Sequence, residues 1–248
     1  MPKYYPQLVL QRKMCPLMTK SKFSEPFLLI NFKTYLEATG KRAVDLASRV
    51  ELVGKNNDVM FGVAPQFCDI AQVAAQVEIP VFAQHIDPVN SGAFTGHVLA
   101  ESVKAAGGSG TLINHSERNV KLIEIEQSVQ RAREAGLSTA VCAGTSRLAA
   151  AVALTEPEMV AIEPPELIGS GHAVSKERPE IVSDSVRKIR AVNQNVRILC
   201  GAGITTGDDL YAALKLGAQG VIVASGVVKA PKPEDVLTDF CKAVRKYV

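Results

Sequence analysis

The chain has 248 residues, of which 47% are hydrophobic, so it can bury a sizeable core. Its 28 basic and 25 acidic residues give a formal net charge of +3, a balance that argues against nucleic acid or an anionic membrane as a partner. Aromatic residues make up only 5%, with no Trp, which argues against a surface that stacks bases or sugars.

The five cysteines contain no Cys-x-x-Cys pair, which argues against a metal site or redox chemistry and favours a reducing, cytoplasmic location. Cys142 and Cys200 lie in apolar runs, so we expect inert core thiols there. No apolar stretch approaches the roughly 20 residues that span a bilayer.

The first 26 residues differ in composition from the rest. They contain five Lys or Arg residues and no acid before Glu25. The apolar run at residues 8–10 is too short for the centre of a signal peptide, so a targeting role has little support. We expect residues 1–26 to be a poorly ordered extension or the product of an upstream start codon, with Met18 as the alternative beginning, and residues 27–248 to form one domain.

After Pro26, short apolar runs alternate with segments of helical period. Runs of Val, Ile, Leu and Ala are typical of strands buried on both faces of a parallel sheet. Between them, apolar residues recur at helical spacing, as from Ala43 to Val50, and a Gly often follows. In chain order, the predicted strands are residues 27–32, 59–64, 81–83, 111–113, 139–142, 159–162, 196–199 and 221–223.

Eight strands that alternate with helices are compatible with a closed (β/α)8 barrel or with an open doubly wound sheet. A dinucleotide-binding open sheet would carry Gly-x-Gly-x-x-Gly after the first strand, where this chain has Asn31-Phe32-Lys33. The chain after Pro26 shows no linker, and its length suffices for a barrel. We therefore predict an α/β protein with a single (β/α)8 barrel domain.

Polar residues follow several of the predicted strands. In such a barrel the carboxyl ends of the strands meet at one mouth, where the chemistry takes place. Each residue alone has an ordinary interpretation: a His at a strand end is more often structural, a Lys there is usually solvated, and Gly-Ala-Gly is common in turns. Their convergence on one mouth favours a site made of Asn31, Lys33, Gln84, His85, residues 114–117, Glu163, residues 201–203 and residues 224–226.

These segments resemble the triosephosphate isomerase family from about residue 27 to the end of the chain, in order and spacing. Asn31-Phe32-Lys33 resembles its first-strand motif, and residues 114–118 (Asn-His-Ser-Glu-Arg) resemble its fourth-strand motif. Residues 162–164 (Ile-Glu-Pro) and 167–171 (Leu-Ile-Gly-Ser-Gly) resemble its sixth-strand segment and lid, and residues 92–96 (Gly-Ala-Phe-Thr-Gly) its interface loop.

Two departures look closest to the compact archaeal branch of that family. The lid segment has no Trp, and His97 stands where other branches usually have Glu. This resemblance implies a homo-oligomer, with a homotetramer favoured over a dimer, and the loop that contains Thr95 implies a subunit contact near the active site.

The resemblance implies a TIM barrel that interconverts D-glyceraldehyde 3-phosphate and dihydroxyacetone phosphate through an enediolate, in glycolysis and gluconeogenesis and without a cofactor. It implies three catalytic residues: Glu163 as the base, His115 as the acid and Lys33 as a fixed positive charge. Backbone N–H groups would bind the phosphate. The implied substrate-binding residues are Asn31, Lys33, Ile168, Gly169, Gly203, Ala224 and Ser225.

Some alternatives stay open at this point. Glu117 either pairs with Lys33 or is an acid at a helix N-terminus, and Glu166 is expected to support the lid hinge or a subunit contact. A different phosphate-binding barrel enzyme, such as an epimerase or a synthase, should lack the set of Lys33, His115 and Glu163. A non-catalytic sugar-phosphate sensor should have lost at least one of the three.

Overall fold

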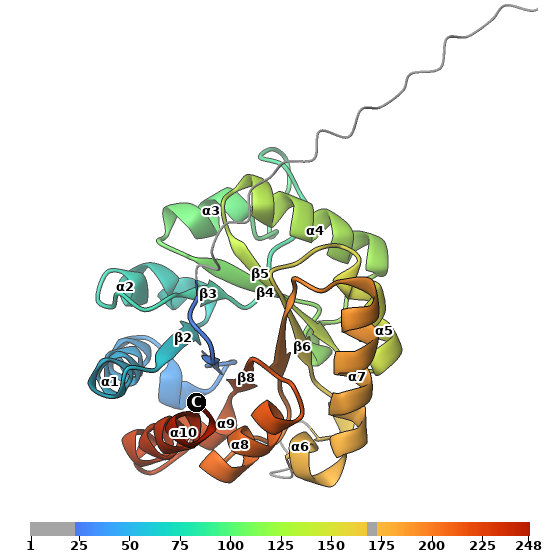
Figure 1. Ribbon diagram of the computed structural model, residues 1–248. Helices are drawn as coiled ribbons and strands as arrows, with labels where there is room; N and C mark the ends of the chain where they lie inside the picture. The colour runs from blue at the N-terminus through green and yellow to red at the C-terminus, as the bar shows by residue number, and fades with distance from the viewer. Residues whose placement is uncertain (1–22, 168–172) are drawn as a thin grey trace, which may run out of the picture.

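The computed structural model describes residues 23–167 and 173–248. Within them, eight parallel strands form a closed ring (Figure 1). The strands pair in the order β2-β1-β8-β7-β6-β5-β4-β3, and a parallel bridge between Val63 and Val81 joins the two ends of this order. The predicted (β/α)8 barrel is confirmed, with β1 Phe27–Asn31, β2 Met60–Ala64, β3 Phe82–Ala83, β4 Gly110–Ile113, β5 Ser138–Ala143, β6 Met159–Ile162, β7 Arg197–Cys200 and β8 Gly220–Val223.

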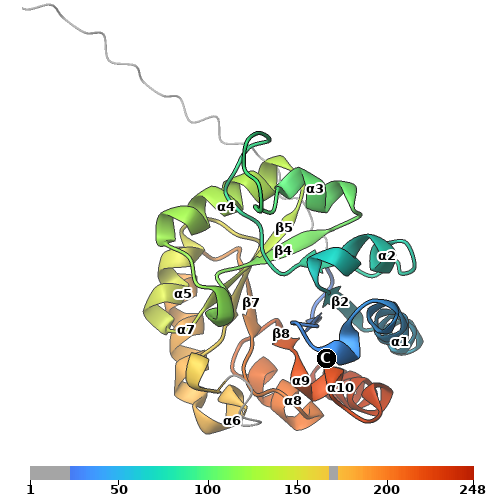
Figure 2. The same cartoon turned by 180° about the vertical axis from the view of Figure 1, so that it is seen from behind.

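Helices connect the strands and surround the ring on its outside, as both views show (Figures 1 and 2). None of the helices in the described ranges is both long and apolar enough to cross a membrane. The α-helices are α1 Lys41–Asn57, α2 Ile70–Ala74, α3 Ala100–Ala105, α4 Leu122–Glu134, α5 Ser146–Ala153, α6 Val174–Glu177, α7 Pro179–Val192, α8 Gly207–Lys215, α9 Ser225–Val228 and α10 Pro233–Tyr247. Short 3-10 helices are η1 Leu36–Ala38, η2 Phe67–Asp69, η3 Ser116–Arg118 and η4 Pro165–Leu167.

The alternation of side chains along each strand decides which residues reach the mouth of the barrel. Successive residues of a strand point to opposite faces, so every second residue faces the barrel axis. On β6, Met159 and Ala161 belong to the inner core, and the next position of the same set is Glu163. The intervening residues pack outward against the helices in a second, larger core. The strand period therefore directs Glu163 toward the axis.

Residues 23–26, which the sequence assigned to the extension, pack against the amino-terminal end of the barrel. The Phe23 ring stacks on Phe27, with centroids 4.8 Å apart, and lies 5.9 Å from the Phe82 ring. Three rings thus close the inner core on the side away from the mouth. The rest of the predicted extension, residues 1–22, lies outside the described residues.

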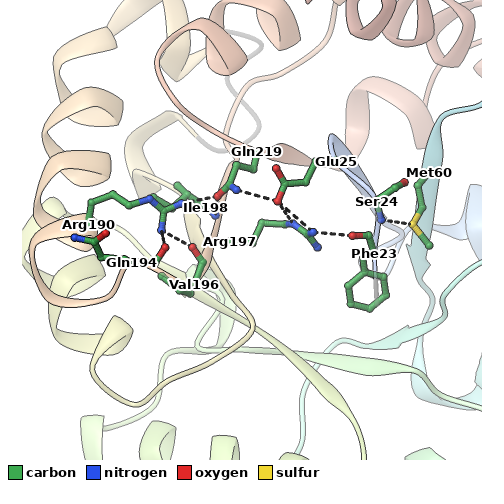
Figure 3. Close-up of polar contacts among 10 residues, drawn as sticks. All are labelled: Phe23, Ser24, Glu25, Met60, Arg190, Gln194, Val196, Arg197, Ile198 and Gln219. Atoms are coloured by element: carbon green, nitrogen blue, oxygen red, sulfur yellow. Dashed lines mark hydrogen bonds and ion pairs between the residues drawn. The ribbon is translucent and has the colours of Figure 1, made fainter. Parts of the chain in front are cut away.

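A buried arginine fixes this segment to β7 (Figure 3). Arg197 Nη2 donates a hydrogen bond of 2.7 Å to the Phe23 carbonyl oxygen and lies 3.3 Å from Glu25 Oε1. Gln219 Nε2 donates to the same carboxylate oxygen at 2.9 Å. An unpaired buried charge is costly, and these contacts offset that cost for the Arg197 guanidinium at the amino-terminal end of the barrel.

Candidate active site

Glu163 follows β6 and is the most deeply buried acid at the mouth, with 4% of its surface exposed. Its N–H donates to the Ala143 carbonyl oxygen at 3.0 Å, which extends the β5–β6 ladder and holds the backbone at the base of this side chain. Its Oε2 is buried and has no hydrogen-bond partner among the described residues. A carboxylate oxygen left unpaired in this way is available to accept a proton from a ligand.

Two buried thiols lie close to this carboxylate. Burial raises the pKa of Cys142 well above its usual range and that of Cys200 to about 12, and the negative charge of Glu163 adds to both shifts. A raised thiol pKa keeps the sulfur protonated at neutral pH. Both cysteines therefore behave as the inert core residues that the sequence predicts.

Gly201, the residue after β7, gives Glu163 its room. A Cβ at this position would lie 2.4 Å from Glu163 Cγ and 2.6 Å from Glu163 Oε1. Even a single methyl group would therefore displace the carboxylate. The sequence indicated a Gly-rich turn at residues 201–203 with Gly203 as a substrate-binding residue, but a requirement for space beside the base has no signal in a single chain.

The substitution Gly201→Ala should lower kcat by about ten- to a hundredfold, because a displacement of about 1 Å in a catalytic group can cost that much. Gly201 does not have a positive φ, so Ala fits the backbone and the fold should remain intact. Steady-state kinetics and the melting temperature would be measured together. An unchanged kcat in a folded variant would show that the carboxylate does not depend on this space.

His115 follows β4 and is 7% exposed. Its Nδ1 accepts a hydrogen bond of 3.2 Å from the N–H of Glu117, in the turn that starts η3. A neutral imidazole that accepts at Nδ1 carries its proton on Nε2. Nε2 lies 3.7 Å from Glu163 Oε2, which is too long for a hydrogen bond and leaves the N–H free to serve a ligand between the two side chains.

Lys33 is held in an unusual backbone conformation, with φ at 47°. Its N–H donates to Asn31 Oδ1 at 2.9 Å, so the buried Asn31 side chain shapes the bend after β1. Its Nζ lies 2.8 Å from Glu117 Oε1. Glu117 thus pairs with Lys33, and it also lies in the first turn of η3, so the structure shows both alternatives for this residue.

Two amide side chains without a predicted role support these groups. Gln84 Nε2 donates to the carbonyl oxygens of Lys33 and Ala64, at 2.8 and 3.0 Å. Asn114, whose φ is 59°, donates to the Cys142 carbonyl oxygen at 2.9 Å from the position directly before His115. The sequence placed both amides at strand ends, but their partners lie on or next to other strands, and one sequence does not reveal such pairings.

The turns after β7 and β8 form the opposite wall of the same pocket. Ala202 and Gly203 have φ values of 67° and 72°, two consecutive residues in the left-handed region. Such successive left-handed or alternating conformations can turn backbone N–H groups into a concave anion site. After β8, Ala224 precedes the single turn of α9, which begins at Ser225. Among the described residues, this wall carries no cationic side chain, so backbone N–H groups are its candidates for binding an anion.

One pocket collects the predicted site residues that the structure describes: Asn31, Lys33, His115, Glu163, Gly203, Ala224 and Ser225 all line it. Ile168 and Gly169, predicted to contact substrate from the lid, lie outside the described residues. Beside that segment, Arg178 Nη2 lies 3.9 Å from Glu166 Oε1, and the expectation that Glu166 supports the lid hinge or a subunit contact stays a prediction.

Comparison with known proteins agrees with this geometry. The family model for triosephosphate isomerase matches residues 26–244. A triosephosphate isomerase from Methanosarcina acetivorans is 51% identical over 219 residues, which cover 88% of this chain and 99% of that protein. The triosephosphate isomerase of Methanocaldococcus jannaschii is 46% identical over 217 residues, with the same coverage of both chains.

Among solved structures, the fold is similar to the crystal structure of triosephosphate isomerase from Bartonella henselae. The TM-score is 0.71 at 19% sequence identity, and the match covers 90% of this chain and 100% of that one. At this identity the likeness concerns the fold alone.

Proposed function

The chain belongs to the triosephosphate isomerase family, and we propose that its barrel mouth interconverts D-glyceraldehyde 3-phosphate and dihydroxyacetone phosphate, the step that this aldose–ketose isomerase would supply to glycolysis and gluconeogenesis. The observation that carries this proposal is the convergence of Glu163, His115 and Lys33 on one pocket whose other wall offers backbone donors. A different phosphate-binding barrel enzyme would need that wall but would not need the three side chains.

Glu163 is the base in this proposal. It removes a proton from C1 of dihydroxyacetone phosphate, the C–H electron pair forms the C1–C2 double bond, and the carbonyl oxygen on C2 takes the negative charge. The same carboxyl group then returns a proton to C2. Its buried, unpartnered Oε2 supports this role, because a base acts best when no competing hydrogen bond must first be broken.

His115 is the acid that serves the two oxygens. Its Nε2–H protonates the oxygen on C2 while charge develops there, and the ring recovers a proton from the hydroxyl on C1 as the aldehyde forms. The hydrogen bond from the Glu117 N–H to Nδ1 supports this assignment, since it places the proton on the nitrogen that faces Glu163.

Lys33 supplies fixed positive charge to the enediolate, with Asn31 as a neighbouring hydrogen-bond donor. The Lys33 side chain is only 10% exposed and is already paired, so little reorganisation is needed as the oxyanion forms. The phosphate lies against Gly203, Ala224 and Ser225, where backbone N–H groups donate hydrogen bonds to an anion.

A coupled assay tests the proposed function directly. Purified protein is given D-glyceraldehyde 3-phosphate, and formation of dihydroxyacetone phosphate is followed through a reporter dehydrogenase. We expect turnover with no metal or cofactor added for the isomerase itself, beyond the nicotinamide nucleotide that the reporter dehydrogenase consumes. Binding of the sugar phosphate without turnover would favour the non-catalytic sensor instead.

We further propose that the native protein is a homo-oligomer, a homotetramer rather than a dimer. The segment between β3 and α3 stands out from the ring of helices in both views (Figures 1 and 2). Asp87 ties its base to Val98 by two hydrogen bonds, of 2.6 and 2.9 Å. The segment presents Phe94, 46% exposed, and the exposed Thr95. The exposed Phe94 ring, on a loop held at its base, is the apolar group that we assign to the subunit contact.

Light scattering at micromolar concentration should give a mass of four times the 26.5 kDa chain. Replacing Thr95 by Arg should shift the protein toward smaller species, because a buried unpaired charge opposes association. A wild-type mass equal to that of one chain would contradict the proposal.

The domain boundary and the location of the protein are also proposals. We propose one barrel domain whose folded part takes in residues 23–26, because Phe23 contributes to the inner core. We propose a cytoplasmic location, which the free thiols of the four described cysteines support, since a reducing compartment keeps thiols unpaired.

A further inference from the structure

A buried carboxylate outside the proposed catalytic group holds the turn that leaves β7. Asp209 is the third residue of α8 and is 5% exposed. Its Oδ2 accepts hydrogen bonds from the N–H of Thr205 at 3.0 Å, from the Thr205 hydroxyl at 3.2 Å and from the N–H of Thr206 at 2.9 Å. Its Oδ1 lies 2.6 Å from Lys176 Nζ on α6.

Capping of α8 explains only part of this arrangement. In a capping box, the residue at this position accepts one hydrogen bond, from the backbone N–H of the N-cap, which here is Thr206. Asp209 accepts two further bonds from Thr205 and an ammonium contact from Lys176. Burial by itself would raise the pKa of Asp209, but the bonds from Lys176, Thr205 and Thr206 outweigh it and hold the pKa below its usual range.

The turn that these bonds fix is the wall of the active-site pocket. Residues 202–205 line the pocket, and Ala202 and Gly203 both adopt the left-handed conformation. An alanine in that region is strained and persists only where the surroundings over-determine it. Asp209 supplies such constraint at Thr205, the far end of the turn, and the Val174 N–H supplies it at the near end, with a 3.3 Å bond to the Ala202 carbonyl oxygen.

The helix that carries Lys176 is tied to the same point by a second contact. The buried Ser175 hydroxyl donates to the Asp209 carbonyl oxygen at 2.9 Å. The side chain and the backbone of Asp209 therefore both join α6 to α8. The turn after β7 cannot shift relative to α6 without breaking these bonds.

We propose that Asp209 is a positioning residue for the substrate phosphate: with Lys176 as its counter-ion, it holds the turn at residues 202–206 in the conformation that aims backbone N–H groups at the phosphate. Asp209 itself does not touch the substrate. The inference rests on the proposed function for its kinetic test, and phosphate binding provides a test that does not depend on turnover.

The test compares a phosphorylated with an unphosphorylated substrate. The substitution Asp209→Asn should raise KM for glyceraldehyde 3-phosphate by about ten- to a hundredfold, because the phosphate donors lose their alignment. The value of kcat/KM for glyceraldehyde, which has no phosphate, should stay within about twofold of wild type. Inorganic phosphate should raise the melting temperature of the wild-type protein and lose most of this effect in the variant.

Glu124 offers a matched control, because it occupies the same third position of α4 and its Oε2 accepts the Lys121 N–H at 2.8 Å. Glu124→Gln should cost similar helix stability and leave KM and the phosphate effect unchanged. If Asp209→Asn does not fold, Lys176→Met can replace it, because this variant keeps the capping box of α8. It should also raise KM for glyceraldehyde 3-phosphate, by a smaller factor.

The outcomes are distinguishable. Equal losses with both substrates, or a full phosphate effect on the melting temperature of a folded Asp209→Asn or Lys176→Met variant, would overturn the positioning role. If wild-type protein isomerises neither substrate, the proposed function fails, and the phosphate effect on melting still decides whether Asp209 shapes an anion site.

Discussion

Replacing Glu163 by glutamine is expected to lower kcat by about two to four orders of magnitude, the usual contribution of a general base. The amide cannot take the proton from carbon, and it keeps the size of the side chain. Stability should move in the opposite direction. The carboxylate is 4% exposed and its Oε2 has no hydrogen-bond partner among the described residues, so a neutral amide removes the cost of burying a charge at this position. We expect the melting temperature to rise by about 2–4 °C, which corresponds to about 1 kcal/mol.

Two further variants show whether the loss is specific to the base. Glu163→Asp keeps the charge but withdraws it by one methylene, and it should still lower kcat by about a hundredfold with the fold intact. Glu166→Gln changes an acid three residues away that is 3.9 Å from Arg178, and it should keep kcat within a few-fold. Circular dichroism and thermal melting accompany the kinetics. A Glu163→Asp protein with near-normal turnover would remove Glu163 from its role as the base.

The fold was predictable because its signal is local and repeated. Each buried strand is a short apolar run, and each helix between the strands has its own apolar stripe, so eight units point to the same architecture. The positions of Asn31 and Glu163 after their strands were likewise predictable, and the structure shows that they continue the inward sets Phe27–Leu29 and Met159–Ala161. What the sequence pattern could not predict was the base of the barrel. There Arg197 contacts Phe23 and Glu25, partners more than 170 positions away, and a single sequence holds no record of such pairs.

The candidate site likewise contains residues that the sequence could predict and residues that it could not. Residues that would touch the substrate stand at strand ends within recognisable motifs, so Lys33, His115 and Glu163 could be named from the sequence. Residues that position these groups or the substrate act through contacts with other segments of the chain. Gly201 matters because Glu163 needs its volume, and Asp209 matters because Thr205 comes within 3.0 Å of it. Both belong to common turn and helix-start patterns, and for this reason composition and spacing gave them no distinct signal.

Replacing Lys33 by methionine is the second change with a large expected effect, a fall in kcat/KM of about a hundred- to a thousandfold, as for the loss of one fixed oxyanion donor. Methionine keeps the length and apolar stem of the side chain, so packing should change little. The loss of charge has two consequences at the site. The enediolate loses its cation, and the Glu117 carboxylate, until then 2.8 Å from Nζ, stays behind as an unpaired negative charge near the developing oxyanion.

The effect of the unpaired Glu117 charge can be measured separately from the effect of losing the Lys33 ammonium. If repulsion from Glu117 contributes, the double variant Lys33→Met/Glu117→Gln should recover part of the loss, whereas Glu117→Gln alone should cost much less than Lys33→Met, because it leaves the ammonium in place. Lys33→Arg should not restore full activity, since a guanidinium differs from an ammonium in shape and in the direction of its donors. Steady-state kinetics on the four proteins, each checked by thermal melting, measure these terms. The hydrogen bond to Asn31 holds the Lys33 backbone at φ 47°, so the methionine substitution should leave the backbone in place. An unaltered kcat/KM in this variant would therefore mean that the ammonium does not act on the enediolate.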